Sequence, residues 1–84
     1  MIRHVAIIGA GLIGASWAAL FLSKGLRVTV CDPSQSALDS LGPFITAAWA
    51  DLAQLDDIDA APPFDKLQVA QDIATACRDA DMVQ

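Results

Sequence analysis

Six residues, Gly9-Ala10-Gly11-Leu12-Ile13-Gly14, place three glycines at fixed intervals near the start of the chain. They follow directly on residues 4–8, a short apolar run rich in β-branched side chains that is typical of a buried strand. They lead into residues 12–24, where small and apolar side chains recur three or four positions apart before a glycine at 25. The sequence therefore predicts a strand, a tight glycine-rich turn and a helix, in that order.

Each glycine in this turn has its own physical reason. Gly9 lets the chain turn sharply off the strand, Gly11 has no Cβ to keep a pyrophosphate from the backbone, and Gly14 lets the helix pack close to the strand. The N–H groups of the first helical turn, around Leu12 and Ile13, have no intrahelical partner and lie at the positive end of the helix dipole. We therefore expect this turn to hold phosphate groups, although a tight turn in a domain without a ligand would use the same glycines.

The rest of the chain alternates between strand patterns and helix patterns. The further strands are expected at 26–31, at 67–71 and from 82 onward; the further helices from 32–34 to about 41, over 44–55 and over 73–79; and a loop over 56–65. Gly42-Pro43 should kink or break the second helix, because proline removes a backbone hydrogen bond. This alternation predicts an α/β fold, a Rossmann-type doubly wound parallel sheet with right-handed crossovers, truncated after the start of the fourth strand.

Asp32 ends the second expected strand, 18 positions after Gly14, close to the spacing of about 20 at which dinucleotide-binding turns carry an acidic residue. Its carboxylate can accept hydrogen bonds from ribose hydroxyls and would repel a 2′-phosphate, and residues 33–36 contain no Arg or Lys to offset that repulsion. We therefore expect NAD rather than NADP, with helix capping as a further role for Asp32. The expected cofactor-binding residues are Gly9, Ala10, Gly11, Leu12, Ile13, Gly14 and Asp32.

The chain is short and very apolar for a domain that stands alone. It has 84 residues, of which 55% are hydrophobic, whereas soluble domains reach about 45–50% even with glycine counted. A small domain also buries a smaller share of its surface than a large one. We therefore expect residues 1–84 to be the N-terminal part of a dinucleotide-binding domain in a longer protein, with residues 81–84 beginning a strand.

Charge and cysteine usage exclude several classes of partner. Ten acidic residues against five basic ones give a net charge of −5, which argues against nucleic acid and, more weakly, against an anionic membrane as a partner.

The uncharged run 5–23 has the composition of a signal peptide or a membrane span, but its three glycines and its strand-like first half favour a buried β–α unit. Cys31 and Cys77 fit no disulfide or zinc pattern, which favours a reducing cytoplasm. The aspartates in 51–59 lack the pattern of a calcium loop, so no metal is expected.

Five further side chains have expected positions. His4, the one histidine, begins the first strand and should lie at the surface or the sheet edge, away from a ligand. Trp17 and Trp49 occur at helical spacing among apolar neighbours, so we expect core or interface positions for both rather than a stacking site. Gln71 and Gln84 end the third and fourth strands, where they are expected to line a cofactor cleft.

These residues together resemble a known family. Val5 to Gly14, continued through Ala15-Ser16-Trp17-Ala18 and on to Val30-Cys31-Asp32, resembles the N-terminal domain of the L-3-hydroxyacyl-CoA dehydrogenase superfamily. The stretch Gly-Leu-Ile-Gly-x-Ser-Trp-Ala is most similar to its lambda-crystallin/L-gulonate 3-dehydrogenase and carnitine dehydrogenase branches. Residues 80–84 resemble the fourth strand of that domain.

The resemblance spans the whole chain but is weak over residues 36–65. Gly42-Pro43 and the loop containing Pro62-Pro63 stand where the family has a long, charged helical stretch. We expect the chain to follow a similar path there, with different local detail.

The resemblance implies hydride transfer between NAD and the hydroxyl group of a small-molecule substrate, a 3-hydroxyacyl-CoA or a related 3-hydroxy acid, in fatty acid metabolism and in the cytoplasm. In the family a His, oriented by a Glu, is the general base on the substrate alcohol, and the matching positions lie beyond residue 84. No catalytic residue is therefore assigned here. The C-terminal catalytic and dimerisation domain is absent from these residues, the full-length protein is expected to be a homodimer, and this chain should bind NAD without turning over substrate.

Two other functions use the same turn and acidic residue. A non-enzymatic NAD-sensing regulatory module is one, although such modules have a shorter connection than residues 32–66 between the second and third strands. The FAD-binding half-domain of a flavoprotein is the other, although flavoproteins more often carry Glu at the position of Asp32, and bound flavin would make the protein yellow. Fold-level analogy does not separate the possible substrates of a dehydrogenase.

Overall fold

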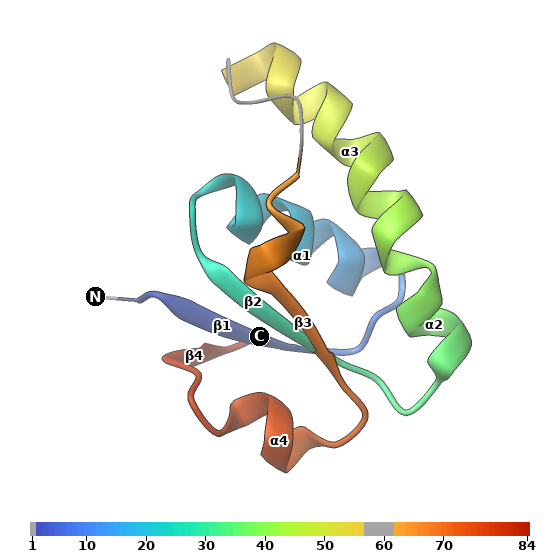
Figure 1. Cartoon of the computed structure of the whole chain (residues 1–84), viewed down its shortest axis with the longest axis vertical. Coiled ribbons are helices and arrows are strands. Elements are labelled where there is room, and N and C mark those ends of the chain that lie inside the picture. Colours follow the sequence, from blue (N-terminus) through green and yellow to red (C-terminus); the bar gives the residue numbers. More distant parts are fainter. Residues whose placement is uncertain (1, 57–61) are drawn as a thin grey trace.

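Four parallel strands form one sheet in the order β3-β2-β1-β4 (Figure 1). The structure, a computed structural model, describes residues 2–56 and 62–84. The chain fills the sheet from β1 to β2 to β3 and then returns to the other side of β1, so its direction of winding changes between β1 and β4. In doubly wound folds such a switch point is where ligands bind. The strands are β1 His4–Ile8, β2 Arg27–Cys31, β3 Leu67–Ala70 and β4 Met82–Val83.

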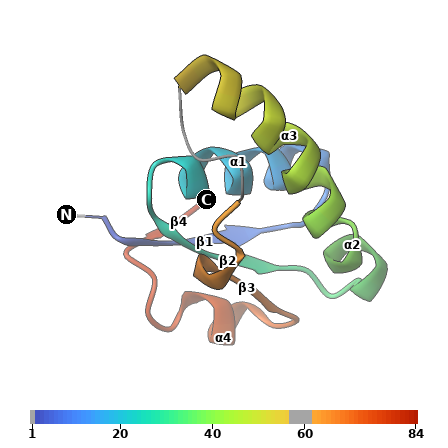
Figure 2. The ribbon, with the colours of Figure 1, turned by 45° about the horizontal axis from the view of Figure 1, so that its top comes forward.

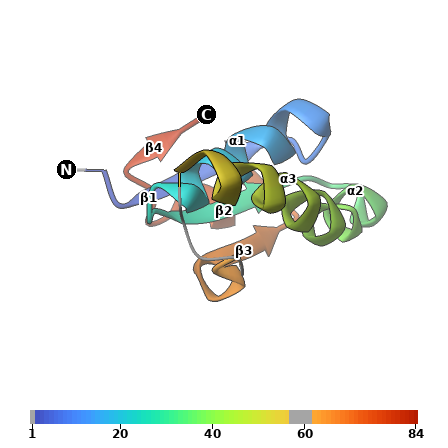
Figure 3. The ribbon, with the colours of Figure 1, turned by 90° about the horizontal axis from the view of Figure 1, so that it is seen from above.

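Helices cover both faces of this sheet, as Figure 2 shows: α1, α2 and α3 lie on one face and α4 on the other. In Figure 3, α1 and α3 lie side by side over the sheet, and they contact each other. The expected α/β, doubly wound parallel sheet is confirmed. The helices are α1 Leu12–Ser23, α2 Gln35–Asp39, α3 Leu41–Asp56 and α4 Ile73–Cys77, with a single 3₁₀ turn, η1 Phe64–Lys66, before β3.

The two central strands are buried on both faces, but with side chains of different size. Val5, Ile7, Val28 and Val30 pack with α1 and α3 in the larger of the two core clusters. On the opposite face, small side chains fill the space under α4, which allows this short helix to lie close to the sheet. Burial on both faces explains why these strands read as continuous apolar runs in the sequence. The small buried residues of this layer are Ala6 on β1, Cys31 on β2 and Ala76 on α4 itself.

Two glycines determine where α1 begins and ends. At its start, a Cβ on Gly14 would collide with the carbonyl oxygen of Gly9, which itself has a φ of +105°. At its end, Gly25 has a φ of +83°, its N–H donates to the carbonyl of Leu22 (3.0 Å), and the next N–H donates to the carbonyl of Phe21 (3.2 Å). This pair of bonds is a Schellman cap.

None of the helices in the described part of the chain has the length and continuous apolarity that a bilayer crossing requires.

The expected break at Gly42-Pro43 was placed wrongly. The helices α2 and α3 separate at Ser40, whose hydroxyl donates to the carbonyl of Ser36 (3.1 Å). Pro43 falls in the first turn of α3, where its missing N–H would have had no intrahelical partner, so the proline costs little there. The first bond into α3 runs from Phe44 N–H to the carbonyl of Ser40 (3.2 Å). Of the loop expected over 56–65, Asp56 is the last residue of α3, residues 57–61 lie outside the described residues, and residues 64 and 65 belong to η1.

We expect Gly14→Ala to lower the free energy of unfolding by about 2 kcal/mol or more, because the added methyl meets a backbone carbonyl that cannot rotate away. Gly42→Ala is the matched control, since a Cβ there meets no atom within 4 Å and alanine favours the helix by up to about 1 kcal/mol. Urea denaturation of both variants checks this. Equal stability of the two variants would contradict the close approach of α1 to the turn.

Candidate functional site

The glycine-rich turn leaves the sheet between the ends of two neighbouring strands. On one side, Gly9 N–H donates to the carbonyl of Cys31 at the end of β2 (2.7 Å). On the other side, Ile8 N–H donates to the carbonyl of Gln84, just after β4 (3.0 Å). The turn is therefore fixed at the switch point of the sheet, where the two halves of a doubly wound fold diverge.

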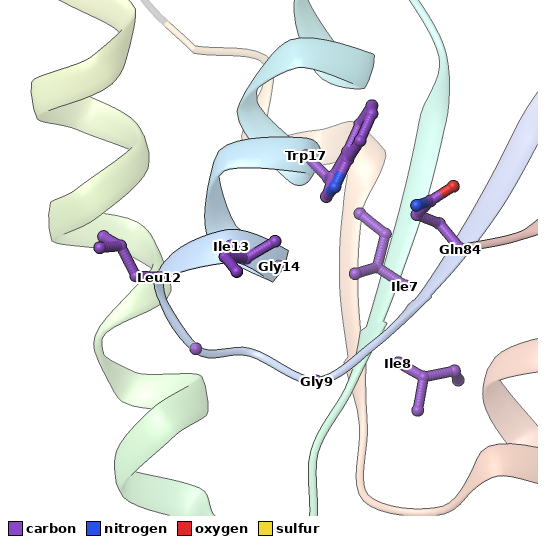
Figure 4. A pocket seen from close by; sticks show the side chains of 9 residues that line it. Ile7, Ile8, Gly9, Leu12, Ile13, Gly14, Trp17 and Gln84 are labelled. Atoms are coloured by element: carbon purple, nitrogen blue, oxygen red, sulfur yellow. The ribbon is translucent and has the colours of Figure 1, made fainter.

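An open hollow of about 580 Å³ lies against this turn (Figure 4). Its volume is within the range of about 300–1,000 Å³ that is usual for small-molecule sites. In Figure 4, Trp17 of α1 and Gln84 flank one side of the hollow, with Ile7 between them, and the turn forms another side. The lining residues are Ile7, Ile8, Gly9, Gly11, Leu12, Ile13, Gly14, Trp17 and Gln84.

Gly11 differs from the other two glycines of the turn. A Cβ built on Gly11 would meet no atom within 4 Å, and its φ of −68° is accessible to any residue. Gly14 is required by the carbonyl of Gly9, and Gly9 by its own positive φ. Neither reason applies to Gly11, so nothing within the described chain explains the absence of a side chain there. Its Cα faces open space at the mouth of the hollow.

The start of α1 presents backbone donors without side-chain competition. Gly11 is the N-cap and supplies no side-chain hydrogen bond, and the first turn of α1 contains no acidic residue. The first intrahelical bond runs from Ala15 N–H to the carbonyl of Gly11 (2.8 Å), so the N–H groups of Leu12, Ile13 and Gly14 precede it. The side chains of Leu12 and Ile13 are 72% and 76% exposed. Donors at the positive end of a 12-residue helix favour an anion.

Asp32 holds the turn against the end of β2. One carboxylate oxygen accepts from Ala10 N–H (2.9 Å) and the other from Ser34 N–H (2.8 Å). These two bonds, the one from Ala10 first, hold the pKa of Asp32 below its ordinary value of 3.8. A carboxylate offers about four lone-pair sites, so capacity for two further donors remains. The cap of α2 is not Asp32 but Ser34, whose hydroxyl accepts from Ala37 N–H (3.3 Å).

Other expected side chains are divided between the site and the core. Gln84 lines the hollow as expected, whereas Gln71 lies outside it and donates to Gln35 of α2 (3.1 Å). Trp49 is buried in the core. Trp17 is partly exposed and stacks on Phe21, with ring centroids 5.5 Å apart.

His4 is more embedded than a surface position implies. It is half-buried at the amino end of β1, where Nε2 lies 2.7 Å from the hydroxyl of Thr29 on β2 and Nδ1 lies 3.2 Å from the carbonyl of Asp79. Asp81 accepts from the N–H groups of Arg3 (2.8 Å) and His4 (3.0 Å). Sequence reasoning missed these bonds, because they join segments that are far apart in the chain. The bonds to Asp79 and Asp81 fix β1 to the loop before β4, and the contact with Thr29 joins it to β2, at the end of the sheet opposite the hollow.

Charge is distributed unevenly along the strand direction. The basic residues precede or begin a strand, and the segments that leave the strands at the hollow carry only neutral or acidic side chains in the part of the chain that the structure describes. A phosphate at the hollow would therefore meet backbone N–H groups rather than side-chain cations. Residues 2–56 and 62–84 also contain no cluster of three or more His, Cys, Asp or Glu that could hold a metal ion. The basic residues are Arg3, Lys24, Arg27, Lys66 and Arg78.

Comparison with known proteins identifies relatives of this turn and sheet. A sequence model of the family described as "3-hydroxyacyl-CoA dehydrogenase, NAD binding domain" matches residues 4–84. An L-carnitine dehydrogenase of Streptomyces griseus is 42% identical over 83 residues, covering 99% of this chain and 24% of the relative. A 3-hydroxyacyl-CoA dehydrogenase of Gibberella moniliformis is 38% identical over 87 residues, covering 99% of this chain and 25% of the relative. The chain thus spans about a quarter of these relatives' length.

Solved structures agree with the fold. The structure of a 3-hydroxybutyryl-CoA dehydrogenase from Escherichia coli superposes with a TM-score of 0.80 at 27% identity, covering 99% of this chain and 18% of that one. A diketoreductase, described as catalysing reactions of dicarbonyl compounds, superposes with a TM-score of 0.75 at 26% identity, covering 98% of this chain and 30% of that one. The same fold thus occurs in both enzymes.

We expect the protein to lose stability in acid through three carboxylates whose pKa values lie below 3.8. Asp32, Asp72 and Asp81 each accept backbone N–H bonds that lower the pKa in the folded state. Their contribution to stability is complete above the ordinary pKa of 3.8 and is lost as the pH falls through the lowered values. Denaturation midpoints measured from about pH 5 downward should fall.

The denaturation midpoint of the variant Asp32→Asn should fall less steeply than that of the wild type over the same pH range. Titration of the side-chain carboxyl carbons by NMR measures each group directly. A midpoint for Asp32 at or above 3.8 would contradict its hydrogen bonds to the turn.

Proposed function

The chain belongs to the family of NAD-binding domains of 3-hydroxyacyl-CoA dehydrogenases, and from this premise we propose that its glycine-rich turn and Asp32 hold the ADP half of NAD. In this proposal the pyrophosphate lies over Gly11 and the first turn of α1, and the adenosine ribose lies against Asp32. The cofactor-binding residues are then Gly9, Ala10, Gly11, Leu12, Ile13, Gly14 and Asp32.

The observation that carries this proposal is the open space at Gly11. Gly11 is the N-cap of α1, a position where Ser, Asn or Asp would add a capping hydrogen bond, and neither its φ nor any neighbouring atom requires a glycine there. A ligand that must approach the backbone within contact distance supplies the missing reason. The uncapped N–H groups of Leu12 and Ile13 support an anionic ligand at the same place.

The surroundings of Asp32 support NAD over NADP. Its carboxylate retains lone pairs after accepting from Ala10 and Ser34, so it can also accept from the two ribose hydroxyls. A 2′-phosphate would instead place negative charge against this ionised carboxylate, and residues 33–36 offer no cation. When NAD is bound, its nicotinamide ring supplies the hydride-transfer chemistry. The residues of this chain bind and orient the cofactor, and none of them is assigned a proton-transfer role.

For the whole protein we infer an NAD-dependent oxidoreductase that acts on the 3-hydroxyl group of a small molecule. Relatives named L-carnitine dehydrogenase and 3-hydroxyacyl-CoA dehydrogenase support this reaction. Residues 1–84 are then the N-terminal part of the NAD-binding domain, because they match about a quarter of those relatives. The substrate, a 3-hydroxyacyl-CoA or a related 3-hydroxy acid, would be bound and turned over by a C-terminal catalytic and dimerisation domain outside these residues.

We infer a cytoplasmic homodimer without nucleic acid or membrane partners, in fatty acid metabolism if the substrate is an acyl-CoA. The net charge of −5 supports the lack of nucleic acid. A non-enzymatic NAD-sensing module would bind the same cofactor without turnover in any longer protein. A flavoprotein half-domain would bind FAD in preference to NADH.

We expect the chain to bind NADH, and Asp32→Ala to weaken that binding at least about tenfold, because two hydrogen bonds to a charged group are lost. Discrimination against NADPH should shrink in the same variant. Asp51→Ala, which removes an exposed carboxylate from α3, is the matched control and should leave both affinities unchanged. Calorimetric titration of the three proteins measures this. A folded wild-type chain that prefers NADPH would refute the role of Asp32.

We also expect Gly11→Ala to weaken NADH binding at least about tenfold while changing the free energy of unfolding by less than about 1 kcal/mol. The added methyl points into open space, so the fold has no reason to change, but it occupies the position where the pyrophosphate would approach. Gly42→Ala serves as the control for a glycine on a helix away from the site. Undiminished NADH affinity in folded Gly11→Ala would remove the observation on which the proposal rests.

A further inference from the structure

A chain of polar side chains lies at the carboxyl end of β3, outside the hollow. The amide nitrogen Nε2 of Gln71 donates to Oε1 of Gln35 (3.1 Å), and Nε2 of Gln35 donates to Oδ1 of Asp39 (2.8 Å). All three side chains are exposed, and the two bonds join the end of β3 to α2. We refer to Gln71, Gln35 and Asp39 as the amide relay.

The amide relay determines which way round each amide lies. An ionised carboxylate only accepts hydrogen bonds, so Asp39 must face the nitrogen of Gln35. The oxygen of Gln35 is then turned toward Gln71. Because that oxygen can only accept, the nitrogen of Gln71 must face it. A flip of Gln71 would place two amide oxygens against each other. The relay therefore leaves Gln71 with one free N–H donor and with Oε1 as a free acceptor, in a fixed orientation.

The position of Gln71 matches one end of the proposed cofactor. The strand order β4-β1-β2-β3 brings together, in sequence along the carboxyl edge of the sheet, the hollow, the glycine-rich turn, Asp32 and Gln71. Asp32 N–H donates to the carbonyl of Ala70 (3.1 Å), so Gln71 comes directly after the residue bonded to Asp32. Adenine is joined to the ribose at the carbon opposite the pyrophosphate arm. A pyrophosphate at the turn and a ribose at Asp32 therefore direct the adenine toward β3, one strand spacing of about 4.8 Å further.

We propose that Gln71, oriented by Gln35 and Asp39, binds the amino edge of the adenine ring and makes the site selective for adenine over 6-oxopurines. This inference rests on the proposed binding of NAD. Oε1 of Gln71 accepts from the exocyclic amine of adenine, and the free N–H of Gln71 donates to the neighbouring ring nitrogen. This is the pairing by which a glutamine amide is complementary to adenine. In hypoxanthine the amine is replaced by an oxygen, which is an acceptor and cannot pair with Oε1. Since the relay opposes a flip of Gln71, the amide cannot adapt to that change.

The amide relay would have a different signature if it only fastened α2 to the sheet. Loss of such a fastening would disturb the neighbouring Asp32 and weaken every dinucleotide equally, whatever its base. Selectivity between bases separates the two roles, because it changes only if Gln71 contacts the ring. The ratio of two dissociation constants is therefore the quantity to measure.

The experiment titrates the 84-residue chain with NADH and with reduced nicotinamide hypoxanthine dinucleotide, which differs only in the base. We expect the wild type to bind NADH about tenfold more tightly, and Gln71→Ala to reduce this ratio to about one. Asp39→Ala should reduce the ratio as well, with a smaller loss of NADH affinity, because it frees the amides to flip. Gln68→Ala removes another exposed glutamine from β3 and should leave the ratio unchanged.

The outcomes separate this inference from the proposal on which it rests. NADH binding that depends on Asp32, combined with a wild-type ratio near one, would overturn the role of Gln71 alone. A ratio that survives in both Gln71→Ala and Asp39→Ala would overturn it too, and Asp39→Ala decides the matter if Gln71→Ala does not fold. A folded wild type that binds neither dinucleotide would overturn both the proposed function and the adenine contact.

Discussion

The hydrogen bond from Ala10 N–H to the carboxylate of Asp32, 2.9 Å long, joins the two segments on which the candidate site depends. Beside it, Gly9 N–H donates to the carbonyl of Cys31, so two bonds made within the chain hold the glycine-rich turn to the end of β2. Burial of β1 and β2 on both faces keeps the two strand ends in register beneath them. The donors and the acceptor expected to hold a dinucleotide are thus assembled in advance, which lowers the ordering cost of binding.

The same arrangement explains how an acidic protein can hold a doubly charged pyrophosphate. Each basic residue precedes or begins a strand, while the segments that leave the strands carry Asp32, Asp72 and neutral side chains. Phosphate oxygens at the turn would therefore be held by backbone N–H groups and the dipole of α1 rather than by ion pairs. The phosphate groups of an acyl-CoA substrate would likewise meet no basic side chain at the carboxyl edge of the sheet within the described residues.

Local patterns in the sequence were sufficient for the strands, the turn and the position of Asp32, because each depends on residues close together in the chain. The boundary between α2 and α3 was wrong, since Pro43 fits the first turn of a helix as well as it breaks one, and only the bonds of Ser40 decide between the two. The contacts of His4 with Thr29 and of Gln71 with Gln35 could not be anticipated. They join side chains of different elements, and no spacing rule relates such pairs before the sheet order is known.

Binding of the pyrophosphate of NAD by the N–H groups at the start of α1 has a direct spectroscopic signature. Amide chemical shifts of the ¹⁵N-labelled chain, followed by NMR during a titration with NADH, test it directly. We expect the largest changes at Leu12, Ile13 and Gly14, with little change at Arg3 and Arg27 at the opposite end of the sheet. Changes confined to that opposite end, or none in a folded chain at saturating NADH, would contradict it.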